Sequence, residues 1–286
     1  MFIDTHCHLD AYEEFSKESL DALFERLRSN TAKLSAGPTA NGEASWNSPK
    51  NAKEDFVQMP EAFIHVACSP ESFDRGVELS EKYPFVFTAY GIHPECVLRE
   101  TPSDEERLLE LLKHPKAIAC GEFGLDYHYG KDTRKQQLNL FQRHLQLGIQ
   151  SGKPLVLHLR EADDDALAIL RSVNLQGKNI HVHCFTVDPE FVEELLSLDA
   201  NVFIGFTGIV TFKSAQNVRD AASLVPYERI LLETDTPYMA PVPFRGKTCH
   251  PGFIPYTAQM LATLKKMDLE ELYRQCRKNT RICYGI

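Results

Sequence analysis

Short runs of apolar and β-branched residues alternate along this chain with longer stretches in which apolar residues recur every three or four positions. The short runs are typical of buried strands, and the longer stretches are typical of amphipathic helices. The alternation repeats about eight times, which predicts parallel βα units. The predicted strands are residues 2–9, 62–68, 86–92, 117–122, 155–159, 180–184, 202–206 and 230–235. Eight such units predict an α/β fold, a single TIM (β/α)8 barrel.

The helical pattern is well developed in residues 135–150, between the fourth and fifth predicted strands. Leu138, Phe141, Leu145 and Ile149 fall at spacings of three and four along one face. Such a stripe faces the core while the remaining positions face water. We therefore expect helices of this kind to form the outer ring of the barrel.

Two further segments complete the organisation of the chain. Residues 254–283 predict two helices divided near Asp268, which is a natural N-cap for the second helix. Residues 34–59 are rich in Gly, Pro, Ala, Asn and Ser and break the alternation. We interpret them as an insertion loop, either a solvated excursion or a flap near the substrate. With no other break, we expect residues 1–286 to form one domain.

Composition and charge narrow the classes of function. Hydrophobic residues make up 43% and charged residues 25% of the chain, values that exclude disordered, collagen-like and coiled-coil proteins. No apolar run approaches the roughly 20 residues of a membrane-spanning helix, so we expect no membrane partner. The chain has 31 basic and 40 acidic side chains, a net charge of −9. A nucleic-acid ligand would therefore need local positive charge, from metal ions or a few arginines.

Cysteine usage and the first residues indicate a location inside a cell. The eight cysteines are Cys7, Cys68, Cys96, Cys120, Cys184, Cys249, Cys276 and Cys283, with no close CxxC pairing. Several lie in apolar runs, as reduced core thiols do, so we expect a reducing compartment without a disulfide framework. The first ten residues, MFIDTHCHLD, do not resemble the basic and then apolar start of a secretory signal. We expect an intracellular protein, cytoplasmic, or nuclear in a eukaryote.

Candidate metal ligands begin in the first predicted strand. His6 and His8 flank Cys7, and strand alternation sends both imidazoles to one side while Cys7 faces away. Two imidazoles on one side can chelate a metal ion. An isolated HxH pair is more often two surface or core histidines. Its place at the end of the first strand favours the ligand interpretation, because the strand ends of a parallel barrel meet on one face.

Glu122, His158 and His183 end the fourth, fifth and sixth predicted strands. A buried carboxylate needs a positive partner, either a cation or, as the alternative, an arginine. A single histidine at a strand end is often a packed core residue. Two on successive strands, together with Glu122 and the HxH pair, favour a metal site.

Asp235 ends the eighth predicted strand in ILLETDTPY, where Glu233 shares its side by alternation. With Asp235 the set holds four histidines and two carboxylates, enough for two adjacent divalent ions. Nitrogen and carboxylate ligands suit Zn²⁺ or Mn²⁺, while Mg²⁺ prefers more oxygen ligands.

The ordered motifs MFIDTHCHLD, YGIHPE, GEFGLDY, LVLHLR, HVHCF and LLETDTPY resemble those of the TatD family of metal-dependent deoxyribonucleases, in the amidohydrolase superfamily. The resemblance covers nearly the whole chain and implies a TIM barrel with its metal site at the carboxyl ends of the strands. It implies the metal ligands His6, His8, Glu122, His158, His183 and Asp235. It also implies that Glu122 bridges two ions and that Asp235 takes a proton from the nucleophilic water. His93, Asp126, Arg160 and Arg245 match family positions near the substrate.

These features predict a deoxyribonuclease that hydrolyses DNA phosphodiester bonds with two divalent ions, Zn²⁺, Mn²⁺ or Mg²⁺. The acidic net charge favours a short footprint on single-stranded DNA or frayed ends, and hence exonuclease action. Arg160 and Arg245 either hold phosphate oxygens or form structural ion pairs. Two alternatives stay open. One is an amidohydrolase-type enzyme for a small amide, lactone or phosphoester, since one fold serves many reactions. The other is a metal-binding or nucleic-acid-binding protein without catalysis.

Overall fold

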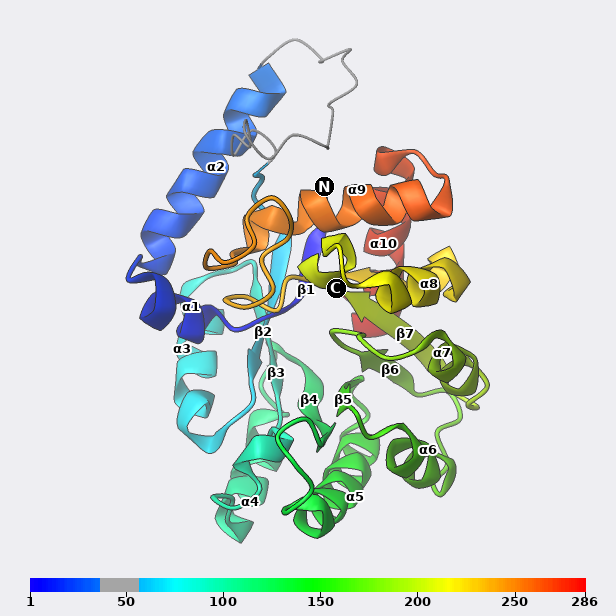
Figure 1. The fold of residues 1–286 in the computed structure, drawn as a ribbon. Helices are drawn as coiled ribbons and strands as arrows, with labels where there is room; N and C mark the ends of the chain where they lie inside the picture. Colours follow the sequence, from blue (N-terminus) through cyan, green and yellow to red (C-terminus); the bar gives the residue numbers. More distant parts are fainter. Residues whose placement is uncertain (37–56) are drawn as a thin grey trace.

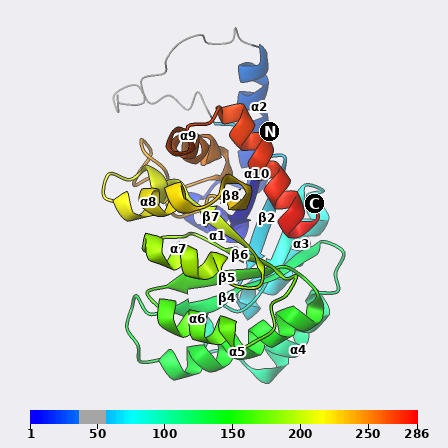
Figure 2. The same ribbon diagram turned by 90° about the vertical axis from the view of Figure 1, so that its right-hand side faces the viewer.

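The structure is a computed structural model that describes residues 1–36 and 57–286. In this part of the chain, eight parallel strands form one sheet in the order β1 to β8. Cys7 forms a parallel bridge with Thr236, and the Asp235 amide donates to the His6 carbonyl over 2.9 Å. The end of the sheet thus returns to its beginning, which confirms the predicted TIM barrel. Figures 1 and 2 show the helices arranged around the strands.

The elements alternate along the chain as the sequence predicts. The strands are β1 (Ile3–Cys7), β2 (Ala62–Ala67), β3 (Val86–Tyr90), β4 (Ala117–Asp126), β5 (Leu155–Arg160), β6 (Asn179–Val182), β7 (Asn201–Phe206) and β8 (Ile230–Leu232). The α-helices are α1 (Leu9–Ser16), α2 (Leu20–Ala36), α3 (Phe73–Lys82), α4 (Pro102–Leu111), α5 (Arg134–Ser151), α6 (Asp163–Arg171), α7 (Pro189–Leu196), α8 (Gln216–Leu224), α9 (Ile254–Lys265) and α10 (Leu269–Tyr284). No helix among the described residues combines the length and apolarity needed to cross a membrane.

Several predicted boundaries were wrong. Strand β8 ends at Leu232 rather than at residue 235, because the chain turns at Asp235, where φ is 57°. Strand β4 continues past Glu122, because its pairing with β5 extends to the Asp126 and Arg160 pair. Helix α2 extends through residues 34–36, which were predicted as loop. The rest of the predicted insertion, residues 37–56, lies outside the described residues.

The helices pack on the barrel through the apolar faces that their spacing predicts. In α5, Phe141 and Leu145 are fully buried, and the Phe141 ring lies 5.8 Å from that of Phe123 in β4. Asp268 divides α9 from α10 as expected, since its side chain accepts the backbone N–H groups of Glu270 and Glu271. Such a cap contributes about 1 kcal/mol to helix stability.

The C-terminal end of α10 packs among residues of the barrel strands. Cys283 and Tyr284 are buried against a cluster that includes Ile64 and Phe203. The Tyr284 hydroxyl lies 2.5 Å from Nδ1 of His181, which is fully buried in β6. The Tyr284 side chain of α10 is therefore in hydrogen-bond contact with a buried histidine of the barrel strands.

We expect Gly124→Ala to destabilise the fold through the β4 and β5 pair. Gly124 has φ of +155°, and a Cβ there would lie 1.9 Å from the His158 carbonyl oxygen. Overpacking costs about 1–3 kcal/mol, in addition to the positive-φ strain that the control below shares. The matched control is Gly130→Ala, where φ is +118° and nothing lies within 4 Å of the new Cβ. Thermal unfolding should give a clearly lower Tm for Gly124→Ala, and equal Tm values would contradict this packing.

Candidate active site

All six side chains that the sequence predicts as metal ligands meet at the carboxyl ends of the barrel strands. They come from five strands and the residues that follow them: His6 in β1, His8 after β1, Glu122 in β4, His158 in β5, His183 after β6 and Asp235 after β8. The HxH pair points to one group as alternation predicts, since His6 and His8 both approach Glu122. The convergence is thus a property of the structure, while the ligand role of each residue stays a prediction.

Glu122 stands at the centre of this group. Its Oε2 lies 2.6 Å from Nε2 of His183, 3.5 Å from Nε2 of His6 and 3.7 Å from Nδ1 of His158. Its Oε1 lies 3.5 Å from Nε2 of His8. One buried carboxylate therefore faces four imidazoles, with its two oxygens turned to different partners. Such a carboxylate has the shape required to bridge two cations.

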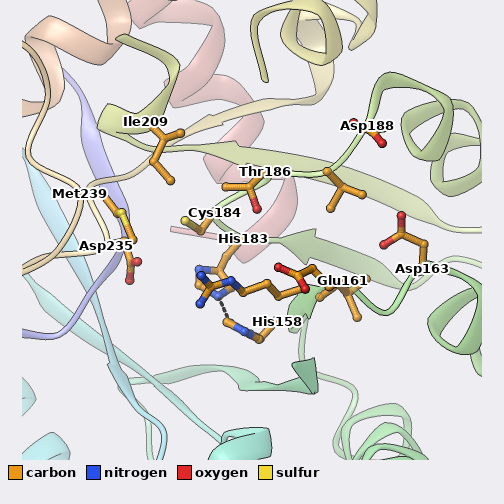
Figure 3. A pocket seen from close by; sticks show the side chains of 13 residues that line it. His158, Glu161, Asp163, His183, Cys184, Thr186, Asp188, Ile209, Asp235 and Met239 are labelled. Atoms are coloured by element: carbon orange, nitrogen blue, oxygen red, sulfur yellow. Dashed lines mark hydrogen bonds between the residues drawn. The ribbon is translucent and has the colours of Figure 1, made fainter. Parts of the chain in front are cut away.

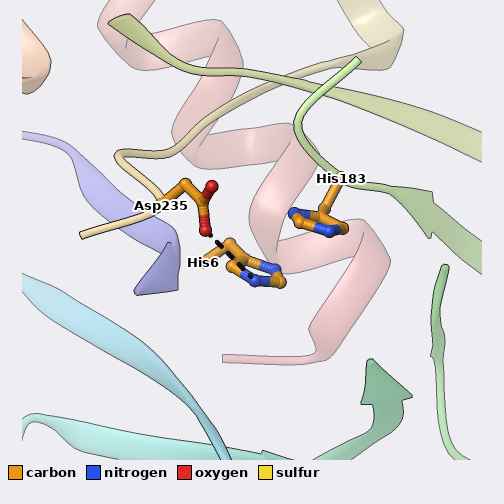
Figure 4. A group of neighbouring side chains, drawn as sticks. All are labelled: His6, His183 and Asp235. Atoms are coloured by element: carbon orange, nitrogen blue, oxygen red, sulfur yellow. Dashed lines mark ion pairs between the residues drawn. The ribbon is translucent and has the colours of Figure 1, made fainter. Parts of the chain in front are cut away.

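Asp235 completes the group beside His6 and His8. Its Oδ1 lies 3.5 Å from Nε2 of His8 and 3.9 Å from Nε2 of His6. Figure 4 shows this ion pair beside His183, whose ring stacks on that of His6 with centroids 3.8 Å apart. Three strand ends thus supply donors to one side of Glu122.

The residues fit divalent cations, because several of their buried donor atoms have no hydrogen-bond partner. In the described part of the chain these include Nδ1 and Nε2 of His6 and Nδ1 of His183. Buried polar atoms without partners cost about 1–3 kcal/mol each. Donor atoms also fall within 4.8 Å of one another in the groups His6, His8 and Glu122; His6, His183 and Asp235; and Glu122, His158 and His183. Imidazole nitrogen with carboxylate oxygen is a donor set that Zn²⁺ and Mn²⁺ accept.

The electrostatics differ between the imidazoles of this group. Burial, and then the neighbouring His183, hold the pKa of His6 well below its ordinary value, which keeps His6 in the neutral form that binds metals. Burial also acts to lower the pKa of His158. Contacts with Asp126 and Glu122 outweigh it and raise this pKa to about 9. The carboxylates therefore attract a positive charge to this position.

Hydrogen bonds orient two of the imidazoles. Nδ1 of His8 lies 3.0 Å from the carbonyl oxygen of Val66, which accepts its proton and leaves Nε2 facing Glu122 and Asp235. Nε2 of His158 lies 2.9 Å from Oδ2 of Asp126, while its Nδ1 lies 3.0 Å from Nε2 of His183. In each ring one nitrogen is hydrogen-bonded to a residue outside the group of predicted ligands, and the other nitrogen faces that group.

Two cavities open beside the group. The first, of about 480 Å³, is lined by Glu161, Asp163, Thr186, Asp188 and Ile209, among others (Figure 3). The second, of about 420 Å³, is lined by Ser69, Ser72, His93, Tyr129 and Tyr238, among others. Both cavities are lined by His158, Arg160, His183, Asp235 and Met239. A substrate lying across Asp235 and His158 could therefore extend in two directions.

Of the four residues predicted near the substrate, three lie at these cavities. His93 and Asp126 line the second cavity, and Arg160 lines both. Arg245 lines neither; its guanidinium lies 4.4 Å from the centre of the Phe212 ring. The structure therefore places Arg245 on an aromatic side chain outside the cavities, which the spacing of its motif could not reveal.

Glu233 also differs from expectation. Its Oε2 lies 2.8 Å from Nε2 of His181, and its Oε1 accepts the backbone N–H of Cys184. Burial, the largest effect, raises the pKa of Glu233 to about 8. The partners of Asp235 are His6 and His8 instead, because the positive φ of Asp235 interrupts the alternation.

Strained backbone gathers at the first cavity. Among the described residues, six that are not glycine have positive φ, and four of these, Glu161, Cys184, Asp235 and Met239, line this cavity. Each such conformation costs about 1–3 kcal/mol and persists where the surrounding structure enforces it.

The sequence analysis did not name three residues that line the cavities, Tyr129, Tyr238 and Met239. A signal was present, since Tyr238 is the last residue of the Asp235 motif LLETDTPY and Met239 directly follows it.

Comparison with known proteins identifies the family to which this chain belongs. Residues 3–285 match the family described as TatD related DNase. The chain is 36% identical to the human protein named 3'-5' RNA nuclease TATDN2, over 100% of this chain and 35% of that protein. It is 36% identical to the Escherichia coli protein named uncharacterized metal-dependent hydrolase YcfH, over 94% of this chain and 90% of that one.

A crystal structure of YJJV, a TatD homologue from Escherichia coli K12, has the same fold. It superposes with a TM-score of 0.79 at 26% identity, over 100% of this chain and 98% of that one. The family match, the named relatives and the shared barrel agree with one another. The chain therefore belongs to the TatD related DNase family and is a metal-dependent hydrolase built on a TIM barrel.

Proposed function

We propose that this hydrolase cleaves phosphodiester bonds of DNA, as an exonuclease on single-stranded or frayed ends. The observation that carries the proposal is the buried Glu122 among four imidazoles, with Asp235, beside two cavities that share Arg160. The match to a DNase family supports DNA as the substrate.

Two divalent ions, Zn²⁺, Mn²⁺ or Mg²⁺, fit this centre. His6, His8, Glu122 and Asp235 are proposed to hold one ion, and Glu122, His158 and His183 the other. When bound, such ions act as Lewis acids toward water and a phosphoryl oxygen. Glu122 belongs to both sets of ligands, so this side chain is proposed to contact both ions.

Asp235 is proposed to accept the proton of the attacking water. It lines both cavities, whereas Glu122 lines only the second. The side chain of Asp235 is 12% exposed, compared with 3% for Glu122. A carboxylate open to the substrate space can take a proton, while one enclosed by imidazoles is better suited to holding cations.

Arg160 and two tyrosines are proposed to bind the nucleic acid. The guanidinium of Arg160 can donate paired hydrogen bonds to phosphate oxygens, which the net charge of −9 does not otherwise attract. Tyr129 is 80% exposed, and Arg160 lies 5.7 Å from its ring centre. Tyr238 is 43% exposed, and its ring packs edge-on against Phe15. Exposed rings that line a cavity suit stacking with unpaired bases.

RNA is a second candidate substrate, because the human relative is named as an RNA nuclease. The barrel and donor set also suit amide or lactone hydrolysis.

We further propose a reducing compartment, cytoplasmic or nuclear, since all eight cysteines are free.

The purified protein with added Mn²⁺ should shorten a single-stranded DNA oligonucleotide from one end and lose this activity to a chelator. Divalent ions should restore it. Gel analysis of matched DNA, RNA and duplex substrates, alongside a small amide and a lactone, measures the preference. Faster cleavage of RNA would transfer the proposal to RNA. Hydrolysis that survives exhaustive chelation would remove the metal mechanism.

Asp235→Asn should reduce kcat by about 10²–10⁴, the range typical of losing a general base. Much of the metal should stay bound, because the histidines and Glu122 remain. Turnover is measured together with metal content. Asp188→Asn, which changes a carboxylate of the first cavity outside the donor groups, is the control. Near-normal kcat with filled metal sites would assign the proton to another acceptor.

Tyr129→Leu and Tyr238→Leu should raise the KM for single-stranded DNA while leaving turnover of a small phosphodiester unchanged. Loss of stacking is worth about 1–3 kcal/mol per base, or roughly 5–150-fold. Tyr227→Leu is the matched control, since Tyr227 is 45% exposed and lines neither cavity. Equal KM values in all three variants would exclude base stacking at these rings.

A further inference from the structure

We infer that Asp126 is a positioning residue that fixes the tautomer and orientation of His158, instead of a group that contacts the substrate. The inference rests on the metal centre proposed above. It differs from the role that the family resemblance suggests for Asp126, which is a place near the substrate.

The two nitrogens of His158 face different partners. Nε2 lies 2.9 Å from Oδ2 of Asp126, within hydrogen-bond distance. Nδ1 lies 3.0 Å from Nε2 of His183 and 3.7 Å from Oε2 of Glu122. A carboxylate only accepts protons, so the hydrogen bond to Asp126 places the ring proton on Nε2. The lone pair of Nδ1 is then directed into the group of predicted ligands.

Asp126 is itself held from three directions. Its Oδ1 accepts the backbone N–H of His128 over 2.8 Å. The side chain of Gln137 in α5 accepts the backbone N–H of Asp126 over 2.8 Å and donates to its carbonyl oxygen over 2.9 Å. Asp126 is 5% exposed and Gln137 is 4% exposed. One carboxylate oxygen thus accepts a backbone N–H group. The other lies nearest His158, with Nη1 of Arg160 farther away at 3.8 Å, and Gln137 of α5 holds the backbone of Asp126 at the end of β4.

A cation held by His93, Asp126 and His158 is the alternative, since their donor atoms lie within 4.8 Å of one another. However, His158 could bind one cation through Nδ1 and another through Nε2 only after losing its remaining ring proton. Nδ1 of His93 is also engaged, because it accepts the backbone N–H of Glu95 over 3.2 Å. A hydrogen bond from His158 to Asp126 accounts for the geometry without this deprotonation.

The expected effect is on metal affinity. Carboxylates that hold a metal-binding histidine from outside contribute about 10–100-fold to affinity. Asp126→Ala should therefore weaken one of the two Zn²⁺ equivalents by about this factor and leave the other unchanged. Asp126→Asn should lose less, because its amide oxygen can still accept the proton of Nε2.

The chain offers a matched control. Glu161 also pairs with an imidazole, Nδ1 of His128 at 2.6 Å, but neither residue belongs to the predicted ligands. Glu161→Ala removes a carboxylate from a histidine in the same region and should leave both Zn²⁺ equivalents unchanged. Gln137→Met keeps the Asp126 carboxylate while removing its backbone clamp, so it serves as a second variant with a smaller expected loss.

The experiment is a Zn²⁺ titration of the full chain and these variants by competition with a chelating dye. It is combined with ¹⁵N NMR of the histidine rings in the metal-free protein, recorded at a pH above the His158 pKa of about 9, where this ring is neutral and has a single ring proton. Thermal unfolding checks that each variant is folded. The wild type should show the Nε2–H tautomer of His158, and Asp126→Ala should show a mixture of tautomers together with the weakened equivalent.

Three results would overturn the inference. Unchanged Zn²⁺ affinity and tautomer in Asp126→Ala, with a raised KM, would assign Asp126 a role in substrate binding instead. Three Zn²⁺ equivalents in the wild type, one of them lost in Asp126→Ala, would assign a cation to His93, Asp126 and His158. A wild-type protein that binds no Zn²⁺, Mn²⁺ or Mg²⁺ would remove the proposed metal centre itself, which distinguishes that failure from the failure of this inference.

Discussion

The burial of the Glu122 carboxylate among four imidazoles is the constraint on which the rest of this site depends. An ionised carboxylate that is 3% exposed is stable only beside compensating positive charge. The imidazoles come from β1, β5 and the ends of β1 and β6, so the barrel must bring these strand ends together. Closure between Asp235 and His6 brings the last donor to the same place. The fold and the chemistry are therefore coupled through one buried charge.

The backbone departs from regular strand geometry at or next to residues that are predicted metal ligands. The β4 and β5 register shifts between Gly121 and Phe123, and this shift lies at Glu122. Cys184 and Asp235, which have positive φ, lie two and three residues beyond the ends of β6 and β8. Strain of this kind persists only where the surroundings enforce it, and it gathers at functional sites. Regular strands thus build the barrel, and the irregular residues at their ends aim the side chains.

The negative net charge limits how this protein could bind the nucleic-acid substrate that we propose. A net charge of −9 repels a polyanion over long distances, so affinity for a nucleic acid must come from the mouth of the barrel. In the proposed function, cations held at the centre, Arg160 and the exposed rings of Tyr129 and Tyr238 would supply it. Such a local set suits a chain end more than a long duplex. The acidic side chains Glu161, Asp163 and Asp188 limit where phosphates can lie in the first cavity.

The sequence by itself determined what depends on residues close together along the chain. Strand and helix periods predicted the barrel, alternation turned His6 and His8 to one side, and Asp268 capped α10 as its position indicated. Tertiary structure alone decided which distant residues meet. It paired Asp126 with His158, gave Glu233 to His181, and placed Arg245 on Phe212 outside the cavities. Local propensity sets the repeating elements, whereas these contacts depend on barrel closure and register, which no short stretch of sequence encodes.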